Sequence, residues 1–392
     1  MSSSARRSLG DIAAGLRQLI VGWTGGGTST SLFNTSSTWS VVNAAILSTA
    51  GWVAVLGRES TPTNNIFASF GLRGWTWLGY RVGNIAPTTS NNPTAAVSYV
   101  NSSAFATPTI FIATADLRIW SSSSIFASTG WTSRASNFNT AGFVVGARYH
   151  DIYSRITNKV CWAYGQNASG QGAVLRAGAG AVTFTALTVF DRTDNVRYTA
   201  GTWGSINSVF NTPQNDVVFG ASDGNLYYQN PNGLARVTVS GLPGSGAITA
   251  LTWTGTRYLV QRVNSGIIYS NVCDRIENVT SWTQVPDNGE LGRGFDTTGG
   301  SNNFTNAFHY NRDYSKIITT GANSSVWVST NDGVTWTKES LTSTILGNTN
   351  VGWIRLLYNT SFNEWQVVAA ARSDGNLTGS LLRQSAYSSA LN

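Results

Sequence analysis

The strongest constraint on the fold of this chain is a unit of short β-prone runs and tight turns that recurs along its length. Its clearest copy is 326–337, where Asp332-Gly333 separates two such runs and Trp336 follows the turn. An Asp-Gly pair in this setting predicts a β-hairpin, because glycine adopts positive φ and the aspartate carboxylate can bond the backbone amides of its own turn. The tryptophan ring is expected to fold over the hairpin and bury apolar area.

Seven segments share the order of an apolar run, a polar turn and a second run. Two of the turns are nearly identical, one containing Asp223-Gly224 and the other Asp374-Gly375. An outer strand follows every unit but the last after a further turn, and it is often opened by an aromatic residue beside a threonine, as in Trp282-Thr283. The first runs are 52–56, 110–113, 160–164, 217–220, 258–260, 316–319 and 365–368. The second runs are 66–69, 117–121, 173–176, 226–229, 267–270, 326–329 and 379–382.

The period of this repeat predicts an all-β fold, a β-propeller over residues 37–392. A period of about 45–55 residues is typical of four-stranded blades, and the count of units predicts seven blades, with six as the alternative. The segment 37–42 has the aromatic–threonine pattern of an outer strand, so we expect it to complete the last blade. Pairing the two ends of the chain would close the ring and remove open sheet edges. A long β-sandwich or two stacked sheets is the competing architecture.

Residues 1–22 differ from the repeat and predict a short amphipathic helix or arm. Ser8 is a possible N-cap, and a glycine-rich break lies in the linker 23–36. The helix could pack on its own domain, anchor the chain in a neighbouring subunit, or lie on a membrane surface. We predict the anchor, with these partner-binding residues: Arg6, Arg7, Leu9, Ile12, Leu16, Leu19 and Ile20.

The low charge content restricts the partners of the chain. Only 11% of the residues are charged, against roughly 25% in ordinary globular chains. The net charge is +7 and comes almost entirely from arginine, with lysine at only Lys159, Lys316 and Lys338. Arginine suits partly desolvated protein interfaces better than lysine does. Since no basic run exceeds Arg6-Arg7, we predict no nucleic-acid partner.

Metal and redox chemistry have little support in the sequence. Cys161 and Cys273 are the only cysteines, each within an apolar run, which favours buried free thiols without excluding a disulfide. His150 and His309 are isolated, so we predict no metal and no cofactor. We also expect no signal peptide and no membrane span.

The hairpin at 329–336 resembles the Asp-box, Ser-x-Asp-x-Gly-x-x-Trp, with the aspartate displaced by one residue. Asp-box (BNR) repeats mark the propellers of sialidases and of sugar-binding or structural relatives. The resemblance implies that the box stabilises a turn at the blade periphery and is not catalytic. It assigns a structural-turn role to Ser329, Asp332, Gly333, Trp336, Asp223, Gly224, Asp374 and Gly375. The composition, with an N-terminal arm and many Ser, Thr, Asn, Gly and aromatic residues, is also similar to propeller components of bacteriophage particles.

A sialidase-like glycosidase is the enzymatic alternative, and we predict that the chain is not an enzyme. Such an enzyme needs an arginine clamp for a carboxylate, a Tyr–Glu nucleophile and an acidic proton donor. Glu59 beside Arg58 is the best candidate acid, although a surface ion pair is the simpler interpretation. The family's Arg-Ile-Pro signature is missing. The other candidates are Arg148, Arg257 and Arg355, and the charged loop with Asp287, Glu290, Arg293 and Asp296.

The predicted function is that of a non-enzymatic structural protein of a phage particle, in the tail, the collar or a fibre-associated position. A rigid propeller would bind neighbouring virion proteins through its faces and be anchored by its arm. The resulting location is the virion, assembled in the host cytoplasm. A propeller that binds a host-surface glycan or receptor is the second hypothesis, because exposed aromatic side chains can stack on sugars.

Overall fold

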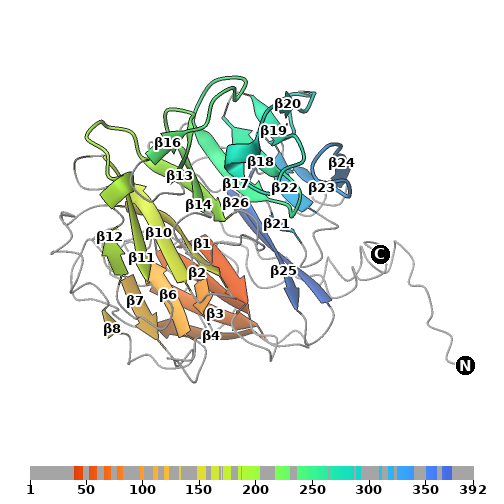
Figure 1. The fold of residues 1–392 in the computed structure, drawn as a ribbon. Coiled ribbons are helices and arrows are strands. Elements are labelled where there is room, and N and C mark those ends of the chain that lie inside the picture. The colour runs from red at the N-terminus through yellow and green to blue at the C-terminus, as the bar shows by residue number, and fades with distance from the viewer. Residues whose placement is uncertain are drawn as a thin grey trace, which may run out of the picture.

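The computed structural model consists of short antiparallel strands arranged as consecutive small sheets (Figure 1). Its side chains are described chiefly between Ala163 and Lys338. It describes residues 39–46, 53–59, 66–71, 77–82, 98–100, 109–113, 119–122, 132–133, 148–155, 160–166, 169, 171–177, 184–186, 188–203, 217–229, 236–263, 265–286, 288–292, 309–310, 317–321, 325–339, 350–359 and 364–372. The predicted arm 1–22 and linker 23–36 lie outside these ranges.

Six four-stranded sheets and one two-stranded sheet follow one another along the described chain. In each sheet the strands pair in sequence order, every strand antiparallel to the next. The first three sheets are β1 (Trp39–Ile46), β2 (Val53–Glu59), β3 (Ile66–Gly71) and β4 (Trp77–Val82); β5 (Ser98–Val100), β6 (Thr109–Ala113), β7 (Ile119–Ser122) and β8 (Thr132–Ser133); and β9 (Arg148–Arg155), β10 (Val160–Gln166), β11 (Gly172–Ala177) and β12 (Phe184–Ala186).

The remaining sheets repeat this plan, and two short 3₁₀ turns accompany them. The fourth and fifth sheets are β13 (Tyr198–Trp203), β14 (Val217–Ala221), β15 (Leu226–Gln229) and β16 (Arg236–Thr238); and β17 (Ile248–Trp253), β18 (Tyr258–Arg262), β19 (Gly266–Ser270) and β20 (Trp282–Gln284). The last two are β21 (His309–Tyr310), β22 (Ile317–Gly321), β23 (Ser325–Ser329) and β24 (Thr337–Glu339); and β25 (Asn350–Asn359) with β26 (Glu364–Arg372). The 3₁₀ turns are η3 (Thr188–Phe190) and η4 (Ile276–Asn278).

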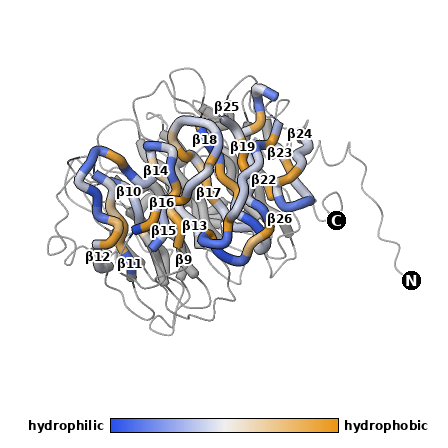
Figure 2. Tube along the Cα trace, turned by 45° about the horizontal axis from the view of Figure 1, so that its top comes forward, coloured by the Kyte–Doolittle hydropathy of each residue, from blue (hydrophilic) through white to orange (hydrophobic). Residues whose placement is uncertain are grey.

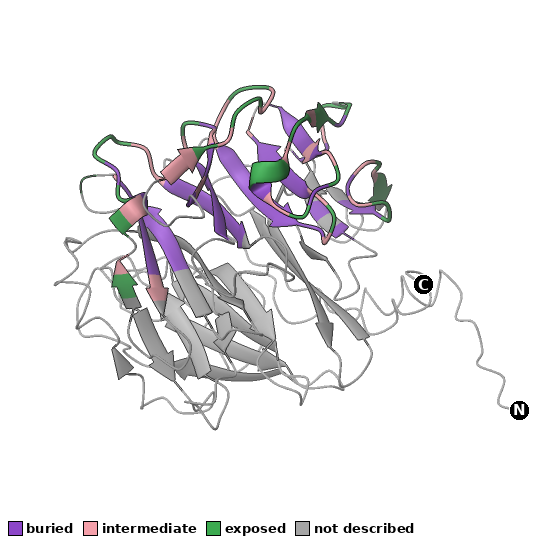
Figure 3. Ribbon diagram, viewed as in Figure 1, coloured by how far each residue is buried: buried purple, intermediate pink, exposed green. Residues whose placement is uncertain are grey.

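The described core lies between successive sheets. Apolar residues line the strands and hydrophilic residues gather in the connections, as Figure 2 shows. Every residue of β14 and β17 is buried, which is expected for strands that have a sheet on either side. Exposed residues lie in the turns and in outer strands such as β20 and β24 (Figure 3).

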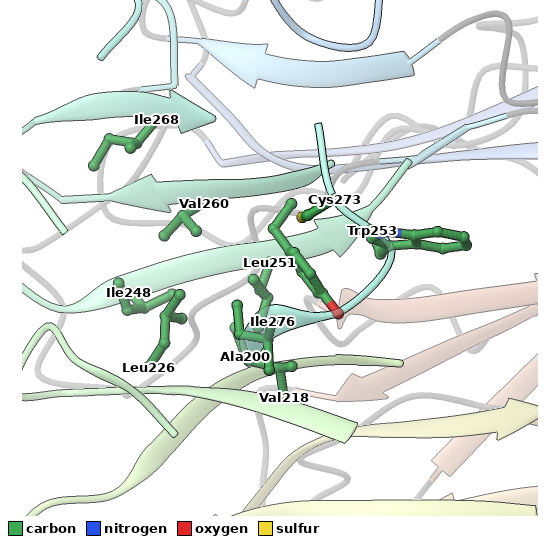
Figure 4. Packing of buried hydrophobic residues seen from close by; sticks show 11 residues of the cluster. Ala200, Val218, Leu226, Ile248, Leu251, Trp253, Val260, Ile268, Cys273 and Ile276 are labelled. Atoms are coloured by element: carbon green, nitrogen blue, oxygen red, sulfur yellow. The ribbon is translucent and has the colours of Figure 1, made fainter. Parts of the chain in front are cut away.

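Two apolar clusters join the third, fourth and fifth sheets. Between the third and fourth, Phe190 packs edge-on against Phe219 with ring centroids 4.9 Å apart. Between the fourth and fifth, Val218 and Ala200 pack with Leu251 and Ile276, as seen in Figure 4. Such interleaved cores fix each sheet against the next.

Each sheet contacts the next one along the chain, and the first sheet also contacts the last. β1 contacts β5, β5 contacts β9, β9 contacts β13 and β13 contacts β17. The fifth and sixth sheets share a core that contains Leu259, Ile317 and Trp327. β22 contacts β25, and β25 and β26 both contact β1.

The prediction that the segment 37–42 supplies the outer strand of the last blade was wrong. The described part of this segment begins β1, which pairs with β2 as the first strand of its own sheet. No pairing between β1 and the last sheet occurs among the described strands. The aromatic–threonine pattern misled the prediction because first strands carry it too, as Thr202-Trp203 in β13 and Thr252-Trp253 in β17 show.

Candidate functional site

The hairpin between β23 and β24 has the turn predicted for it, but a different side chain bonds its backbone. Asn331 Oδ1 accepts a hydrogen bond from the Thr335 amide at 2.9 Å, and Asn331 Nδ2 donates to Thr335 Oγ1 at 2.8 Å. Ser329 Oγ accepts from the Gly333 amide at 2.9 Å. Asn331 therefore performs the role predicted for Asp332. The signal was in the sequence, since Ser329-x-Asn331-x-Gly333-x-x-Trp336 has the unshifted Asp-box spacing with asparagine in place of aspartate.

Asp332 instead links two sheets. It adopts a φ of 56°, the left-handed region that aspartate tolerates better than most residues. Its Oδ2 accepts a hydrogen bond of 2.7 Å from Thr256 Oγ1, in the turn between β17 and β18. Trp336 is half-buried against the core shared with that neighbouring sheet, and its indole N–H donates to Gly333 O at 2.8 Å. The expected packing of this tryptophan is confirmed.

The β14–β15 turn contains the other predicted pair within the described residues. Asp223 Oδ1 accepts from the Asn225 amide at 3.0 Å, and Gly224 has a φ of 83°. Here the prediction that the aspartate bonds its own turn is confirmed. The matching pair, Asp374-Gly375, lies outside the described residues, as do all seven arm residues from Arg6 to Ile20.

A cluster of arginine, tyrosine and aspartate side chains surrounds this turn and forms our candidate site. We call it the Arg–Tyr cluster: Arg192, Asp194, Tyr198, Asp223, Tyr227 and Arg236. Its residues come from the connection between β12 and β13, from the β14–β15 turn and from strands β13, β15 and β16. Sequence reasoning missed Arg192 and Arg236, because neither lies in a motif and only the packing of the third and fourth sheets brings them together.

Arg192 lies at the centre of the Arg–Tyr cluster. Its Nε and Nη2 donate to the two carboxylate oxygens of Asp194 at 2.6 and 2.5 Å, a bidentate pair. Its Nη2 also lies 3.6 Å from Asp223 Oδ2. Only 5% of the Arg192 side chain is exposed, and its Nη1 is buried without a hydrogen-bond partner. The bond to Asp194 holds the pKa of Arg192 above its usual value, and Arg192 in turn lowers the pKa of Asp194.

Two guanidinium groups lie over the ring of Tyr227. Arg192 Cζ is 4.8 Å and Arg236 Cζ 5.0 Å from its ring centroid, both within the range of cation–π attraction. Its hydroxyl donates to Asp223 Oδ2. Arg236 Nη1 also donates to the Tyr198 hydroxyl at 3.3 Å, and that hydroxyl donates to Phe190 O at 2.8 Å.

The electrostatics of the Arg–Tyr cluster suit binding and rigidity rather than proton transfer. Burial raises the pKa of Tyr198 to about 12, and burial together with Asp223 raises the pKa of Tyr227. Both phenols therefore stay protonated near neutral pH. A general acid or base works best with a pKa near the operating pH, which neither tyrosine has.

Of the residues named for a glycosidase, the two whose side chains are described, Arg257 and Glu290, have partners outside the Arg–Tyr cluster. Arg257, the one such arginine whose side chain is described, stacks over Tyr269 at 5.3 Å and donates to Ser270 O at 3.5 Å. Glu290 forms a 2.5 Å ion pair with Lys338. The structure places the backbone, but not the side chains, of four other candidates: Arg58 and Glu59 in β2, Arg148 in β9 and Arg355 in β25. The described residues do not include Asp287, Arg293 and Asp296.

Within the described part of the chain, no group of three or more His, Cys, Asp or Glu side chains is placed to hold a metal ion. Cys273 is a buried free thiol, as predicted for it, and burial raises its pKa. A helix long and apolar enough to cross a membrane is not found among these residues.

Comparison with known proteins identifies the fold. No protein-family model and no curated protein matches this sequence. YCF48 bound to a D1 peptide is similar in structure, with a TM-score of 0.54 and 12% identity over 89% of this chain and 94% of that one. YCF48 from Cyanidioschyzon merolae gives 0.55 and 10% over 89% and 96%, and the β-propeller domain of Myceliophteria thermophila Cps50 (Swd1) gives 0.54 and 10% over 87% and 95%. These structures are β-propellers, and so is this chain.

Proposed function

We propose that this protein is a non-enzymatic structural component of a bacteriophage particle, in which a seven-bladed propeller forms a rigid body that binds neighbouring subunits. The observation that carries the proposal is the engagement of its charged side chains with one another. In the Arg–Tyr cluster, Arg192, Asp223 and Tyr227 hold the fourth sheet and the connection before it in one arrangement. Groups used in this way contribute rigidity and are not available as reactive groups.

The ring of contacts supports the blade count of seven. Each sheet contacts its successor, and β25 and β26 contact β1, which is what a closed ring of seven blades requires. Among the described strands, the last sheet packs against the first without sharing a strand with it. A ring of this kind suits a body that has to keep its shape under the load of an assembly.

Composition and precedent support a binding role. The YCF48 structure contains a bound D1 peptide, so a propeller of this kind can hold a protein segment. The low charge and the arginine bias of this chain suit contacts with protein neighbours. The phage particle is proposed from this composition together with the sequence's N-terminal arm.

The test is whether the protein co-sediments with phage particles. Particles from its source are separated on a density gradient, and each fraction is probed with antibodies against the purified chain. We expect the protein to co-sediment with the particles and to withstand a high-salt wash. Recovery only as a free monomer at the top of the gradient would contradict the proposal. Specific binding of purified protein to one class on a glycan array would favour the receptor-binding alternative.

A further inference from the structure

The last sheet is the only one that the described strands leave with fewer than four members. It consists of β25 and β26, which pair along their whole length. β25 contacts β22 on one side and β1 on the other, so the sheet lies between its neighbours in the ring. Among the described strands, none pairs with the second side of β26. That side is nine residues long and charged only at its ends, Glu364 and Arg372, and such an edge readily pairs with other chains unless a strand covers it.

The sequence directly after β26 repeats a turn whose structure is described. Residues 222–226, Ser-Asp-Gly-Asn-Leu, recur unchanged at 373–377. β14 ends at Ala221, directly before the first copy, and β26 ends at Arg372, directly before the second. β14 and β26 are each the second strand of their sheet. The repeated residues therefore occupy the same place in the order of strands.

In the first copy, the bonds that reverse the chain lie within the turn itself. Asp223 Oδ1 accepts from the Asn225 amide at 3.0 Å, and the Ala221 amide donates to Asn225 O at 3.0 Å. Gly224 has a φ of 83°, and its amide donates to Ala221 O at 3.0 Å. Leu226 then begins β15 and is fully buried. These bonds use only the repeated side chains and the main chain, so the second copy has the same capacity to form a hairpin.

We propose that residues 377–380 form the third strand of the last sheet, on the open side of β26, and that residues 373–392 complete this sheet. The third strand begins where the repeated turn ends, as β15 does, and so starts before the run 379–382 expected from its apolar residues. In the fourth sheet, the pairs after the turn are Gly220 with Leu226, Phe219 with Tyr227 and Val218 with Tyr228. The equivalent pairs in the last sheet are Ala371 with Leu377, Ala370 with Thr378 and Ala369 with Gly379.

The residues after this third strand leave room for an outer strand. In the fourth sheet, the connection after β15 and the outer strand β16 together span residues 230–238. Residues 381–392 are a longer stretch, so a strand as short as β16 fits within it. The ring is then closed by contacts between complete sheets, and no strand from residues 1–38 is needed in it. The arm 1–22 is left available to a neighbouring subunit, and this consequence alone rests on the proposed function.

Engineered cysteine pairs test the register of the proposed strand. Opposed residues on antiparallel strands have Cα atoms about 4.5–5.5 Å apart, which a disulfide can bridge. Ala370→Cys with Thr378→Cys is the proposed pair, and Ala369→Cys with Gly379→Cys is a second pair in the same register. Gln366→Cys with Thr378→Cys is the matched control, because Gln366 lies on the same face of β26 as Ala370 but about 13 Å further along it.

We expect both in-register pairs to form an intramolecular disulfide at least tenfold faster in the folded protein than in urea, where the strands separate. The control pair should show no such gain. Thiol titration measures the rates against a wild-type baseline set by Cys161 and Cys273, and peptide mapping by mass spectrometry identifies the bond.

The possible results distinguish this inference from the proposed function. If the in-register pairs gain nothing on folding, or if the control pair gains as much, the proposed strand is wrong. Disulfides that join two chains would assign the open side of β26 to a second copy of the protein, and would also overturn the inference. None of these measurements involves particles, so absence of the wild-type protein from particles would overturn the proposed function and leave the strand pairing in place.

Discussion

Asn331 fixes the turn between β23 and β24 because its amide bonds in both directions, accepting from the Thr335 amide and donating to the Thr335 hydroxyl. We expect Asn331→Ala to lower the free energy of unfolding by about 1–2 kcal/mol. Asp332→Gly should cost only about 0.5 kcal/mol, because glycine adopts the φ of 56° without strain and the change removes a single exposed hydrogen bond to Thr256. Urea denaturation of the two variants decides between them. A larger loss for Asp332→Gly would restore the role that the sequence first suggested.

At Asp194, the ion pair with Arg192 makes stability depend on pH in a definite direction. The pKa of Asp194 is lower in the folded protein than in the unfolded chain, because the ionised form is paired. Its contribution is therefore complete above the unfolded value of about 4 and is lost as the pH falls through the folded pKa. We expect Asp194→Asn to cost about 1 kcal/mol at pH 7, since Asp194 is largely exposed, and the difference from the wild type to shrink below pH 4. Thermal unfolding from pH 3 to 7 measures this, and a constant difference would contradict it.

At the scale of elements, the β14–β15 turn is packed tightly against the connection between β16 and β17, residues 239–247. A Cβ built on Gly224 would lie 2.6 Å from Gly246 O, and Gly224 has a φ of 83°. Gly289 has a similar φ of 78°, and a Cβ added there would meet nothing within 4 Å, which makes it a matched control. We expect Gly289→Ala to cost about 1 kcal/mol and Gly224→Ala about 3 kcal/mol, the difference being the clash. Equal losses in chemical denaturation would show that the two elements separate easily.

The N-terminal arm gives a second prediction about an element, and it depends on sequence alone. Deleting residues 1–22 should leave the melting temperature and the circular dichroism spectrum of the propeller unchanged, because the described sheets begin at β1. The truncated protein should fail to enter particles if the arm is the anchor. Normal incorporation would remove the arm from the proposed mechanism.

Strands were easier to predict from the sequence than their places in the sheets. The runs 217–220, 258–260, 267–270 and 326–329 correspond to β14, β18, β19 and β23. Their alternating or continuous apolar character and flanking turns are local signals. The first strands, such as β13 and β17, were not located, because the repeat was defined by a hairpin and one outer strand. The Arg–Tyr cluster could not be predicted, since Arg192 and Tyr227 meet only through packing that no local pattern records.

For the whole molecule, a ring of blades should be stable only when it is complete. Deleting residues 350–392 removes β25 and β26, which contact both β22 and β1. We expect the shortened chain to expose two apolar flanks, to expand in small-angle scattering and to aggregate. A monomer as compact and as cooperative in unfolding as the full chain would contradict the seven-bladed ring.

The outermost strands of the fourth, fifth and sixth sheets, β16, β20 and β24, are three residues long each. A rim this short offers too few free amide and carbonyl groups for a second molecule to extend the sheet sideways. These three sheets therefore have little capacity to pair edge to edge with a strand of another molecule, unlike the first sheet, whose outer strand β4 is six residues long. A partner that adds a strand to the propeller is expected to meet the first sheet before these three.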